Sequence, residues 1–225
     1  HIIEFCSPYI KHESSVIEIG CGTGEVLAQI RDRFGCKVTG IEPDPSYQEY
    51  AERVHGIMVM NSMLEEVSPP PDKADLVILS HVLEHFASPR AALQTIRSLL
   101  AADGMVYVEV PNLFFHKSFS VAHPYTFHSG TLRAMLASEG FKVVWMHAHG
   151  RPGLPWVPSN LSTLARRDEE TRVQYAIADY RSVLTRRKLG RLLGRVPEVA
   201  SHGQGMIARM IRRLVGPGRY SRIRD

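Results

Sequence analysis

Three glycines at alternate positions, Gly20, Gly22 and Gly24, separate a short apolar run at 16–19 from a helical pattern at 25–34. Glycines at such a turn let the backbone bend sharply and approach a ligand closely. The N-terminus of a helix that follows the turn favours negative charge, such as that of a carboxylate. The spacing differs from the GxGxxG spacing of dinucleotide-binding folds. We therefore expect a loop that binds a small molecule.

An acidic residue, Glu42, ends the second apolar run of the chain, 22 residues after Gly20. A carboxylate in this position can accept two hydrogen bonds from the hydroxyl groups of a ribose. The alternative is a solvated glutamate in a loop, and Asp44 is a second, less suited candidate. With the glycine turn before it, Glu42 is the predicted ribose-binding residue.

Histidines gather in two parts of the sequence, at 81–85 and at 123–128. His81 and His85 are four residues apart and share a face if a helix starts there, while His123 and His128 lie in a segment rich in aromatic residues. An imidazole accepts protons near neutral pH, which suits a general base. We take His81, His85 and His123 as candidate catalytic residues. The structural alternatives are that His85 caps a turn and that His128 caps the following helix.

Glu84 stands beside these histidines and offers a carboxylate, a ligand that divalent metals accept. The chemistry allows a divalent metal, but nothing completes a ligand set in the sequence, so no metal ligand is assigned. The three cysteines are odd in number and widely spaced, and no pair has CxxC spacing. We expect neither a disulfide framework nor a cysteine zinc site, and reduced thiols in a cytoplasmic protein.

The elements that must position these residues alternate between strand and helix over the first 110 residues. The expected strands are 16–19, 37–41, 57–60, 74–79 and 105–110, and the expected helices are 25–34, 46–54 and 89–100. This alternation predicts a parallel sheet covered on both faces, with ligands bound beyond the carboxyl ends of the strands. After a long loop at 111–128, a helix at 129–139 and two strands at 141–146 and 161–165 are expected.

The composition is that of a globular domain with an appendage. The chain has 225 residues, of which 44% are hydrophobic and 22% charged, and no apolar run reaches the ~18–20 residues of a membrane-spanning helix. Residues 1–167 contain 14 Lys/Arg and 17 Asp/Glu, whereas residues 168–225 contain 13 and 6. We predict a domain at 1–167 and a basic helical extension at 168–225. Because the first residue is His1 and not Met, we expect a longer chain before it.

Five segments resemble, in order and spacing, the motifs of class I S-adenosylmethionine-dependent methyltransferases. They are 18–24 (EIGCGTG), 41–43 (IEP), 75–85 (DLVILSHVLEH), 123–127 (HPYTF) and 132–141 (LRAMLASEGF). The last three are similar to the subgroup that has "VLEH" after the fourth strand. The resemblance covers residues 3–167. It is specific for the cofactor and only indicative for the acceptor.

The resemblance implies a Rossmann-like α/β fold with a mainly parallel seven-stranded sheet, helices on both faces and a final antiparallel strand. It implies S-adenosyl-L-methionine as the cofactor and S-adenosyl-L-homocysteine as its product. The residues implied to bind the cofactor are Glu18, Gly20, Cys21, Gly22, Gly24, Glu42, Pro43, Asn61, Ser62, Met63, Ser80 and His81. Among them, the segment at 61–64 would flank the adenine, and Ser80 and His81 would lie near the sulfonium.

The implied activity is methyl transfer to a hydroxyl of a small molecule, or of a sugar or polysaccharide precursor, with a histidine as general base. The aromatic, histidine-rich loop favours a sugar, and Tyr125, Phe127 and His128 are candidates for acceptor contact. Two alternatives stay open. One is an RNA or protein methyltransferase that docks through the basic extension, and the other is a protein that binds the cofactor without turnover.

Amphipathic helical patterns at 168–195 and 206–215 allow three interpretations of the extension. The helices can pack on the domain or on a second subunit, as in a homodimer. The segment 206–215 can lie on an anionic membrane surface. The arginines can also attract an anionic acceptor, such as a phosphorylated sugar, or RNA. Because no RNA-binding motif is present, we expect no specific nucleic acid partner.

Overall fold

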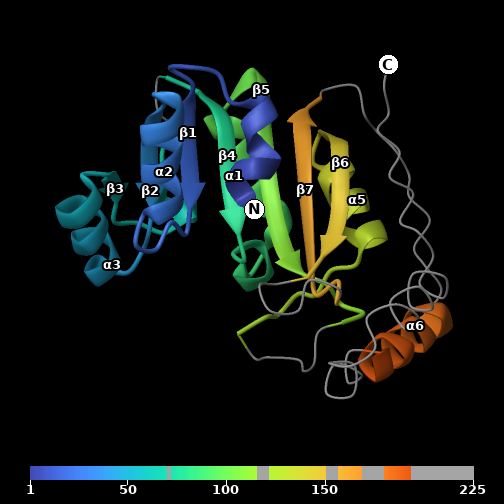
Figure 1. Cartoon of the computed structure of the whole chain (residues 1–225). Helices are drawn as coiled ribbons and strands as arrows, with labels where there is room; N and C mark the ends of the chain where they lie inside the picture. The colour runs from blue at the N-terminus through green and yellow to red at the C-terminus, as the bar shows by residue number, and fades with distance from the viewer. Residues whose placement is uncertain (70–71, 116–121, 151–156, 169–179, 194–225) are drawn as a thin grey trace.

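The computed structural model describes residues 1–69, 72–115, 122–150, 157–168 and 180–193 (Figure 1). The helix expected at 206–215 lies outside the described residues, and so does the first part of the helix expected at 168–195. The membrane and subunit interpretations of the extension therefore stay predictions.

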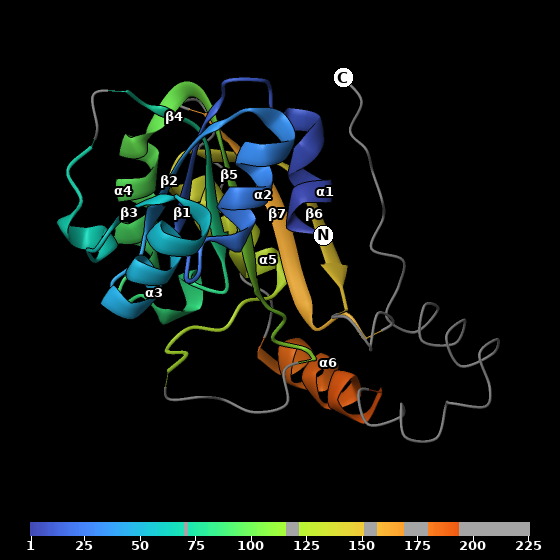
Figure 2. The ribbon, with the colours of Figure 1, turned by 60° about the vertical axis from the view of Figure 1, so that its left-hand side comes forward.

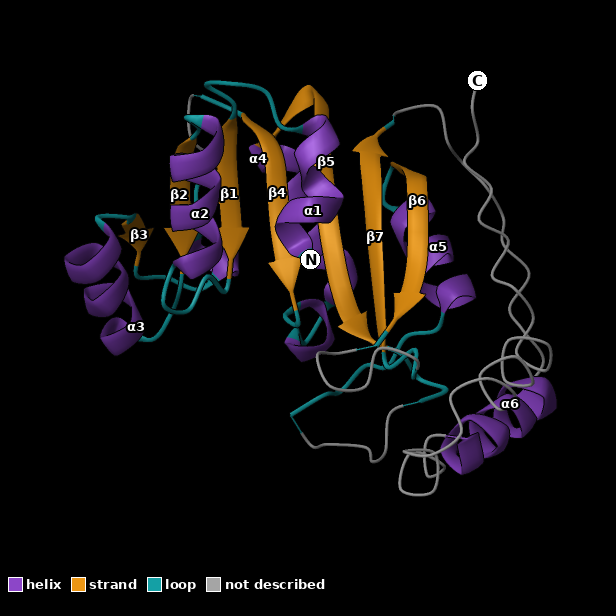
Figure 3. Ribbon diagram, viewed as in Figure 1, coloured by secondary structure: helices purple, strands orange, loops and turns teal. Residues whose placement is uncertain are grey.

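Seven strands form one sheet in the order β3-β2-β1-β4-β5-β7-β6. Their bounds are β1 Ser15–Ile19, β2 Lys37–Ile41, β3 Met58–Met60, β4 Ala74–Ser80, β5 Leu100–Pro111, β6 Phe141–His149 and β7 Asn160–Arg167. The pairs among β1 to β5 are parallel, and β7 runs antiparallel between β5 and β6. This confirms the predicted sheet. The carboxyl ends of the parallel strands meet at one edge (Figure 3).

Helices cover both faces of the sheet (Figure 2). The described helices are α1 Ile2–Cys6, α2 Glu25–Phe34, α3 Pro45–Tyr50, α4 Pro89–Leu99, α5 Ser129–Ser138 and α6 Tyr180–Leu193, with shorter turns η1 Ser7–Tyr9, η2 Ala51–His55, η3 Leu64–Glu66 and η4 Leu83–His85. Buried side chains of α1 and α2 pack on one face, and those of α4 and α5 pack on the other. Among the described residues, every helix is too short or too polar to span a bilayer.

The helix α4 shows how local sequence produces these elements. Its N-cap Ser88 accepts a hydrogen bond from the backbone N–H of Ala91, and Pro89 occupies the first turn, where its missing N–H costs nothing. Leu93 and Ile96 are fully buried and lie three residues apart, so one face of the helix packs on the sheet. The sequence pattern alone predicted this helix to within one residue.

Two elements differ from the sequence prediction. The short helix α1 was not expected, because five residues are too few to show a helical period. The strand expected at 105–110 begins at Leu100, since Leu100 pairs with Ala74 before the register shifts. The Asp103-Gly104 turn therefore lies within β5 and does not precede it.

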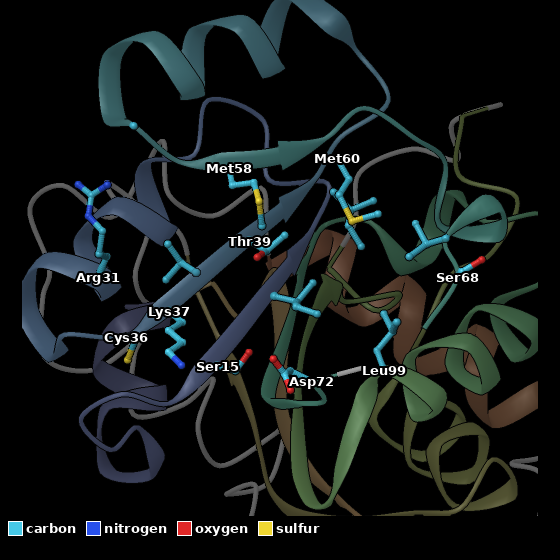
Figure 4. A pocket seen from close by; sticks show the side chains of 15 residues that line it. Ser15, Arg31, Cys36, Lys37, Thr39, Met58, Met60, Ser68, Asp72 and Leu99 are labelled. Atoms are coloured by element: carbon cyan, nitrogen blue, oxygen red, sulfur yellow. The ribbon is translucent and has the colours of Figure 1, made fainter. Parts of the chain in front are cut away.

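A cavity of about 560 Å³ lies along β1, β2 and β3, where the connection from β3 to β4 contains only the short turn η3 (Figure 4). Met58 and Met60 of the edge strand line it and are 64% and 41% exposed. The lining includes neither the glycine loop nor Glu42 nor any of the predicted histidines. The cavity is therefore separate from the residues that the sequence marks for chemistry.

The helix α6 lies beside the carboxyl edge of the sheet, next to the segment that follows β5 (Figures 1 and 2). Arg187 of α6 is buried, and its Nη1 donates a hydrogen bond to the carbonyl oxygen of Leu113, 3.1 Å away. The described part of the basic extension is thus helical and contacts the domain at the edge where ligands are expected.

Candidate functional site

The glycine loop between β1 and α2 has a backbone that only glycine adopts without strain. Gly20, Gly22 and Gly24 have φ values of +65°, +51° and +77°. A Cβ on Gly20 would lie 2.6 Å from Cγ2 of Val82, whereas no atom lies within 4 Å of the Cβ position of Gly22. The loop therefore packs tightly on the turn after β4 and is open on the side of Gly22.

Glu42 is buried and ties the glycine loop to the end of β2. Its Oε2 accepts a hydrogen bond from the backbone N–H of Gly22, and its Oε1 accepts one from that of Asp44, both at 3.0 Å. A carboxylate oxygen has a second lone pair, so each oxygen can accept one further hydrogen bond. The carboxylate is thus held in one orientation and can still accept from a diol.

The residues that follow β3 hold the backbone of Glu42 and Pro43 in place. Nδ2 of Asn61 donates to the carbonyl oxygens of Glu42 and Pro43, each at 3.0 Å. Ser62 donates to the carbonyl oxygen of Met63, whose side chain is 47% exposed. The predicted adenine-flanking segment therefore lies beside Glu42. The amide of Asn61 holds the turn, and the thioether of Met63 offers an apolar surface.

Glu18 is an unpaired carboxylate within β1, directly before the glycine loop. It is 4% exposed, and its Oε2 is buried with no hydrogen-bond partner among the described residues. Burial raises the pKa of Glu18 to about 8. Burial and the nearby Glu18 also raise the pKa of the Cys21 thiol to about 12, so this cysteine stays protonated. A cationic group at the loop would supply the partner that Glu18 lacks.

These observations fit the cofactor that the sequence motifs imply. The loop offers a close approach at Gly22, Glu42 offers acceptors for a diol, and Glu18 offers a buried carboxyl that an ammonium group would ionise. All three lie at the carboxyl ends of β1 and β2, which is where open parallel sheets bind ligands. The half-buried Ser80 ends β4, next to β1 in the same sheet.

His81 bridges two buried carboxylates. Its Nε2 lies 3.2 Å from Oε1 of Glu109, and its Nδ1 lies 3.5 Å from Oε1 of Glu84, an ion-pair distance rather than a good hydrogen bond. These two carboxylates raise the pKa of His81 to about 9. Its φ of +56° is rare for a residue with a side chain and marks a backbone held in place by its surroundings. A protonated imidazole has no lone pair to accept a proton, so the geometry does not fit the base role predicted for His81.

His85 has the geometry that a base needs. Its Nδ1 lies 2.6 Å from the carbonyl oxygen of Ala122, which can only accept, so Nδ1 carries the proton. When the ring is neutral, its lone pair is therefore on Nε2, and the residue is exposed. The ring of His123 packs edge-to-face on that of His85, with centroids 4.6 Å apart. The structure thus brings together two of the three predicted catalytic histidines.

The three predicted acceptor residues have different environments. Tyr125 is 38% exposed and donates to the carbonyl oxygen of Ala87, which holds the loop against the turn after β4. Phe127 is 2% exposed and belongs to the core, so it cannot contact an acceptor. His128 caps α5, since its Nδ1 accepts from the N–H of Gly130. Burial and nearby Arg186 lower its pKa. The prediction of acceptor contacts for Phe127 and His128 is therefore corrected: both have structural roles.

The sequence prediction missed Glu109, which is 1% exposed near the end of β5. Its carboxylate accepts hydrogen bonds from Tyr107 at 2.6 Å and Ser162 at 2.8 Å, and it pairs with His1 at 2.8 Å. Burial alone would raise its pKa, but hydrogen bonds, with that from His149 the first among them, hold the pKa well below its usual range. A glutamate within the apolar run MVYVEV was the signal that could have revealed it.

Two groups of side chains in the described part of the chain could hold a metal ion. His1, Glu109 and His149 form one group, and Glu84, His85 and His123 form the other. Within each group the ligand atoms lie within 4.8 Å of one another. The second group contains Glu84, whose two oxygens are buried without a hydrogen-bond partner among the described residues. The sequence assigned no metal ligands because these residues come from distant segments.

The sequence is similar to those of known proteins. The family model described as "Methyltransferase domain" matches residues 1–145. Ubiquinone biosynthesis O-methyltransferase of Rhodopseudomonas palustris is 31% identical over 112 residues, which are 48% of this chain and 43% of that protein. (S)-coclaurine N-methyltransferase of Thalictrum flavum is 26% identical over 117 residues, 49% of this chain and 32% of that protein. The chain spans less than half the length of these curated relatives.

Solved structures share the fold. A putative S-adenosylmethionine-dependent methyltransferase of Listeria monocytogenes has a TM-score of 0.62 and 16% identity, over 74% of this chain and 98% of its own. A SAM-dependent methyltransferase of Archaeoglobus fulgidus has a TM-score of 0.61 and 20% identity, over 74% and 91%. Phosphoethanolamine N-methyltransferase 2 of Haemonchus contortus, solved with S-adenosylhomocysteine, has a TM-score of 0.57 and 18% identity, over 64% and 37%.

Proposed function

The chain belongs to the methyltransferase-domain family, and we propose that it transfers a methyl group from S-adenosylmethionine to a hydroxyl of a small-molecule or glycan acceptor. The observation that carries the proposal is the pairing of Glu42 with the N–H of Gly22. This contact joins the loop and the carboxylate at the carboxyl ends of adjacent strands, where the cofactor of this family is expected. The class I methyltransferase fold supports it.

The cofactor, when bound, supplies a methyl group that is already activated on a sulfonium. The protein must then hold the acceptor in line and remove its proton. The glycine loop and Glu42 would orient the cofactor, and Glu18 would gain a cationic partner. Ser80 and the turn that follows it would lie beside the acceptor.

We propose that Nε2 of His85 accepts the proton of the acceptor hydroxyl. An acceptor hydroxyl would give its proton to this nitrogen while its oxygen bonds to the methyl carbon. The bond from that carbon to the sulfonium sulfur would break, and S-adenosylhomocysteine would leave. Nδ1 of His85 keeps its own proton, which the carbonyl oxygen of Ala122 accepts. His123 supports the ring through its edge-to-face contact. His81 stays protonated between Glu84 and Glu109 and fixes the backbone of the same turn.

The position of α6 favours an anionic acceptor. Arg186 and Lys188 are exposed on this helix, which lies at the carboxyl edge of the sheet. Positive charge near a binding edge raises the local concentration of anions. A phosphorylated or nucleotide-linked sugar would satisfy this preference, whereas the name of the Rhodopseudomonas palustris relative points to a quinone precursor.

Calorimetry with S-adenosylmethionine tests the cofactor part of the proposal. We expect binding by the wild-type chain and at least a tenfold loss of affinity in Glu42→Ala, since a buried acceptor of two hydroxyl hydrogen bonds is removed. Glu49→Ala, on the exposed surface of α3, is the matched control. Equal affinity in Glu42→Ala and the wild type would reject the assignment.

A turnover screen that detects S-adenosylhomocysteine tests the acceptor part. Sugars, nucleotide-linked sugars, catechols, quinols, RNA and peptides serve as acceptors. Product with a hydroxyl acceptor supports the proposal, and product with RNA or peptide alone replaces it with the docking alternative. Cofactor binding without product from any class would instead identify a protein that binds the cofactor without turnover.

A further inference from the structure

A second cluster of metal-ligating side chains comes from β5, from β6 and from the residue before α1, and β7 lies between the two strands. His1 precedes α1, Glu109 lies near the end of β5, and His149 ends β6. These residues are up to 148 positions apart in the sequence, yet their ligand atoms lie within 4.8 Å of one another. Nothing in the proposed methyl transfer requires His1 or His149.

Hydrogen-bond donors surround the carboxylate at the centre of the cluster. Glu109 is 1% exposed, and the hydroxyls of Tyr107 and Ser162 donate to its Oε2 at 2.6 and 2.8 Å. Metal-binding carboxylates are commonly oriented by such donors from surrounding residues. The hydroxyl donors therefore hold Glu109 in a fixed position and occupy both lone pairs of Oε2, so a metal ion at Oε2 would have to displace one of them.

The imidazole of His149 is oriented in the same way. Its Nδ1 lies 2.9 Å from the carbonyl oxygen of Gly150, which can only accept, so this nitrogen carries a proton. Its Nε2 lies 2.7 Å from the hydroxyl oxygen of Ser162 and 3.6 Å from Oε2 of Glu109. Because the Ser162 hydroxyl donates its own proton to Glu109, Nε2 donates to Ser162 here, and a metal ion would have to replace the proton on Nε2. A metal-binding histidine characteristically donates its other ring N–H to a backbone carbonyl.

Two separations of the ligand atoms come near those of a tetrahedral zinc centre. Zinc bonds to histidine nitrogen and carboxylate oxygen are about 2.0–2.2 Å long, which places two tetrahedral ligand atoms about 3.3–3.5 Å apart. Oε2 of Glu109 lies 2.8 Å from Nε2 of His1 and 3.6 Å from Nε2 of His149. These distances lie on either side of the ideal value, so small side-chain shifts would suffice.

We propose that His1, Glu109 and His149 bind a zinc ion with a fourth coordination position left for water or an acceptor oxygen. Two imidazoles and one carboxylate suit zinc, whereas magnesium prefers oxygen ligands. The group of Glu84, His85 and His123 has similar ligands, but it belongs to the acceptor site already described. In the cluster around Glu109, the proposed methyl transfer leaves His1 and His149 without a role.

Zinc titration by calorimetry, with metal analysis after dialysis, tests the proposal on the full chain. We expect His149→Ala and His1→Ala to lose one equivalent of zinc or at least about tenfold in affinity, since each removes a ligand. Glu109→Gln should do the same. Because Glu109 is buried, the two histidine variants provide the test at positions where folding is less at risk.

Two control variants separate this site from other imidazoles. His147→Ala removes a ring two residues away on the same strand, and His123→Ala disrupts the other group. Both should retain the equivalent that His149→Ala loses. Cobalt in place of zinc should give the visible absorption of a four- or five-coordinate site in wild type and not in His149→Ala.

No zinc bound by the wild type, or equal zinc in the wild type, His1→Ala and His149→Ala, would overturn the proposal. Loss of the same equivalent in His123→Ala but not in His149→Ala would also overturn it and locate the ion in the other group. The measurement needs neither cofactor nor acceptor, so its outcome is independent of whether the chain transfers methyl groups.

Discussion

Nε2 of His81 lies 3.2 Å from Oε1 of Glu109, so the residue that follows β4 is paired with a buried carboxylate of β5. The backbone of His81 also donates to the carbonyl oxygen of Glu109 at 2.8 Å. Side chain and backbone therefore fix the turn after β4 to the next strand. The histidine that follows β4 thus anchors the turn, and we propose His85 as the base in its place.

This division of roles predicts different kinetic defects. We expect His85→Ala to lower kcat by about 10²- to 10⁴-fold, as removal of a general base does, with little change in affinity for S-adenosylmethionine. His85→Asn keeps the size and polarity of the side chain and should be equally impaired. A kcat for His85→Ala within twofold of wild type would remove His85 from the mechanism.

The pairing of His81 predicts a pH-dependent contribution to stability. Its pKa is raised from 6.5 to about 9, so the folded state binds more protons than the unfolded state between these values. The stabilisation is fully present below pH 6.5 and is lost as the pH rises through 9. Thermal melts should show that His81→Gln destabilises the protein at pH 6 and much less at pH 9.5.

The control for His81 is His12→Gln, which changes an exposed imidazole. It should not reproduce the loss of stability at pH 6 that we expect for His81→Gln. A constant difference between His81→Gln and wild type from pH 6 to 9.5 would contradict the ion pairs of His81 with Glu84 and Glu109.

The unpaired carboxylate of Glu18 predicts a second effect of pH. Because burial raises its pKa from 4.5 to about 8, the folded state again retains the proton longer, and stability falls as the pH rises from 4.5 to 8. Without cofactor, Glu18→Gln should therefore melt higher than wild type at pH 8 and close to wild type near pH 5. The same variant should bind S-adenosylmethionine more weakly, since it lacks the charge. The same difference in melting temperature between Glu18→Gln and the wild type at pH 5 and at pH 8 would contradict this account.

The close approach of Gly20 to Val82 predicts a packing defect. Gly20→Ala would adopt a φ of +65° with its Cβ 2.6 Å from Cγ2 of Val82, and we expect a loss of about 1–3 kcal/mol in the free energy of unfolding. Gly22→Ala has similar φ but open space, so its cost should be smaller. Urea unfolding measures both. The double variant Gly20→Ala with Val82→Ala should recover part of the loss, and no recovery would mean that strain, not contact, dominates.

Much of the sheet and the cofactor edge could be predicted because they depend on local sequence. The helix at 25–34 has a helical apolar period and ends at Gly35 in the left-handed conformation, and β2 is a short strand between clear breaks. The glycine loop and Glu42 follow strands directly, so strand order alone brings them together. Such positions need no knowledge of distant contacts.

The chemistry of individual side chains depends on partners that the sequence does not reveal. The pairing that does not fit a base role for His81 could not be foreseen, because its partner Glu109 is 28 residues away on another strand. Phe127 and His128 lie in the loop that resembles an acceptor lid, yet one fills the core and the other caps α5. Aromatic and imidazole rings serve burial, capping and binding equally well, and only the surroundings distinguish these uses.

The hydrogen bond from Arg187 to Leu113 has a consequence for how ligands arrive. The helix α6 carries five basic residues and no acidic one, and this contact attaches it to the edge where the parallel strands end. Residues 1–167 contain more acidic than basic residues, so α6 adds positive charge at that edge to a part of the chain that is acidic as a whole. Anions approaching by diffusion would be guided toward the same side of the protein at low ionic strength, and added salt would weaken this guidance.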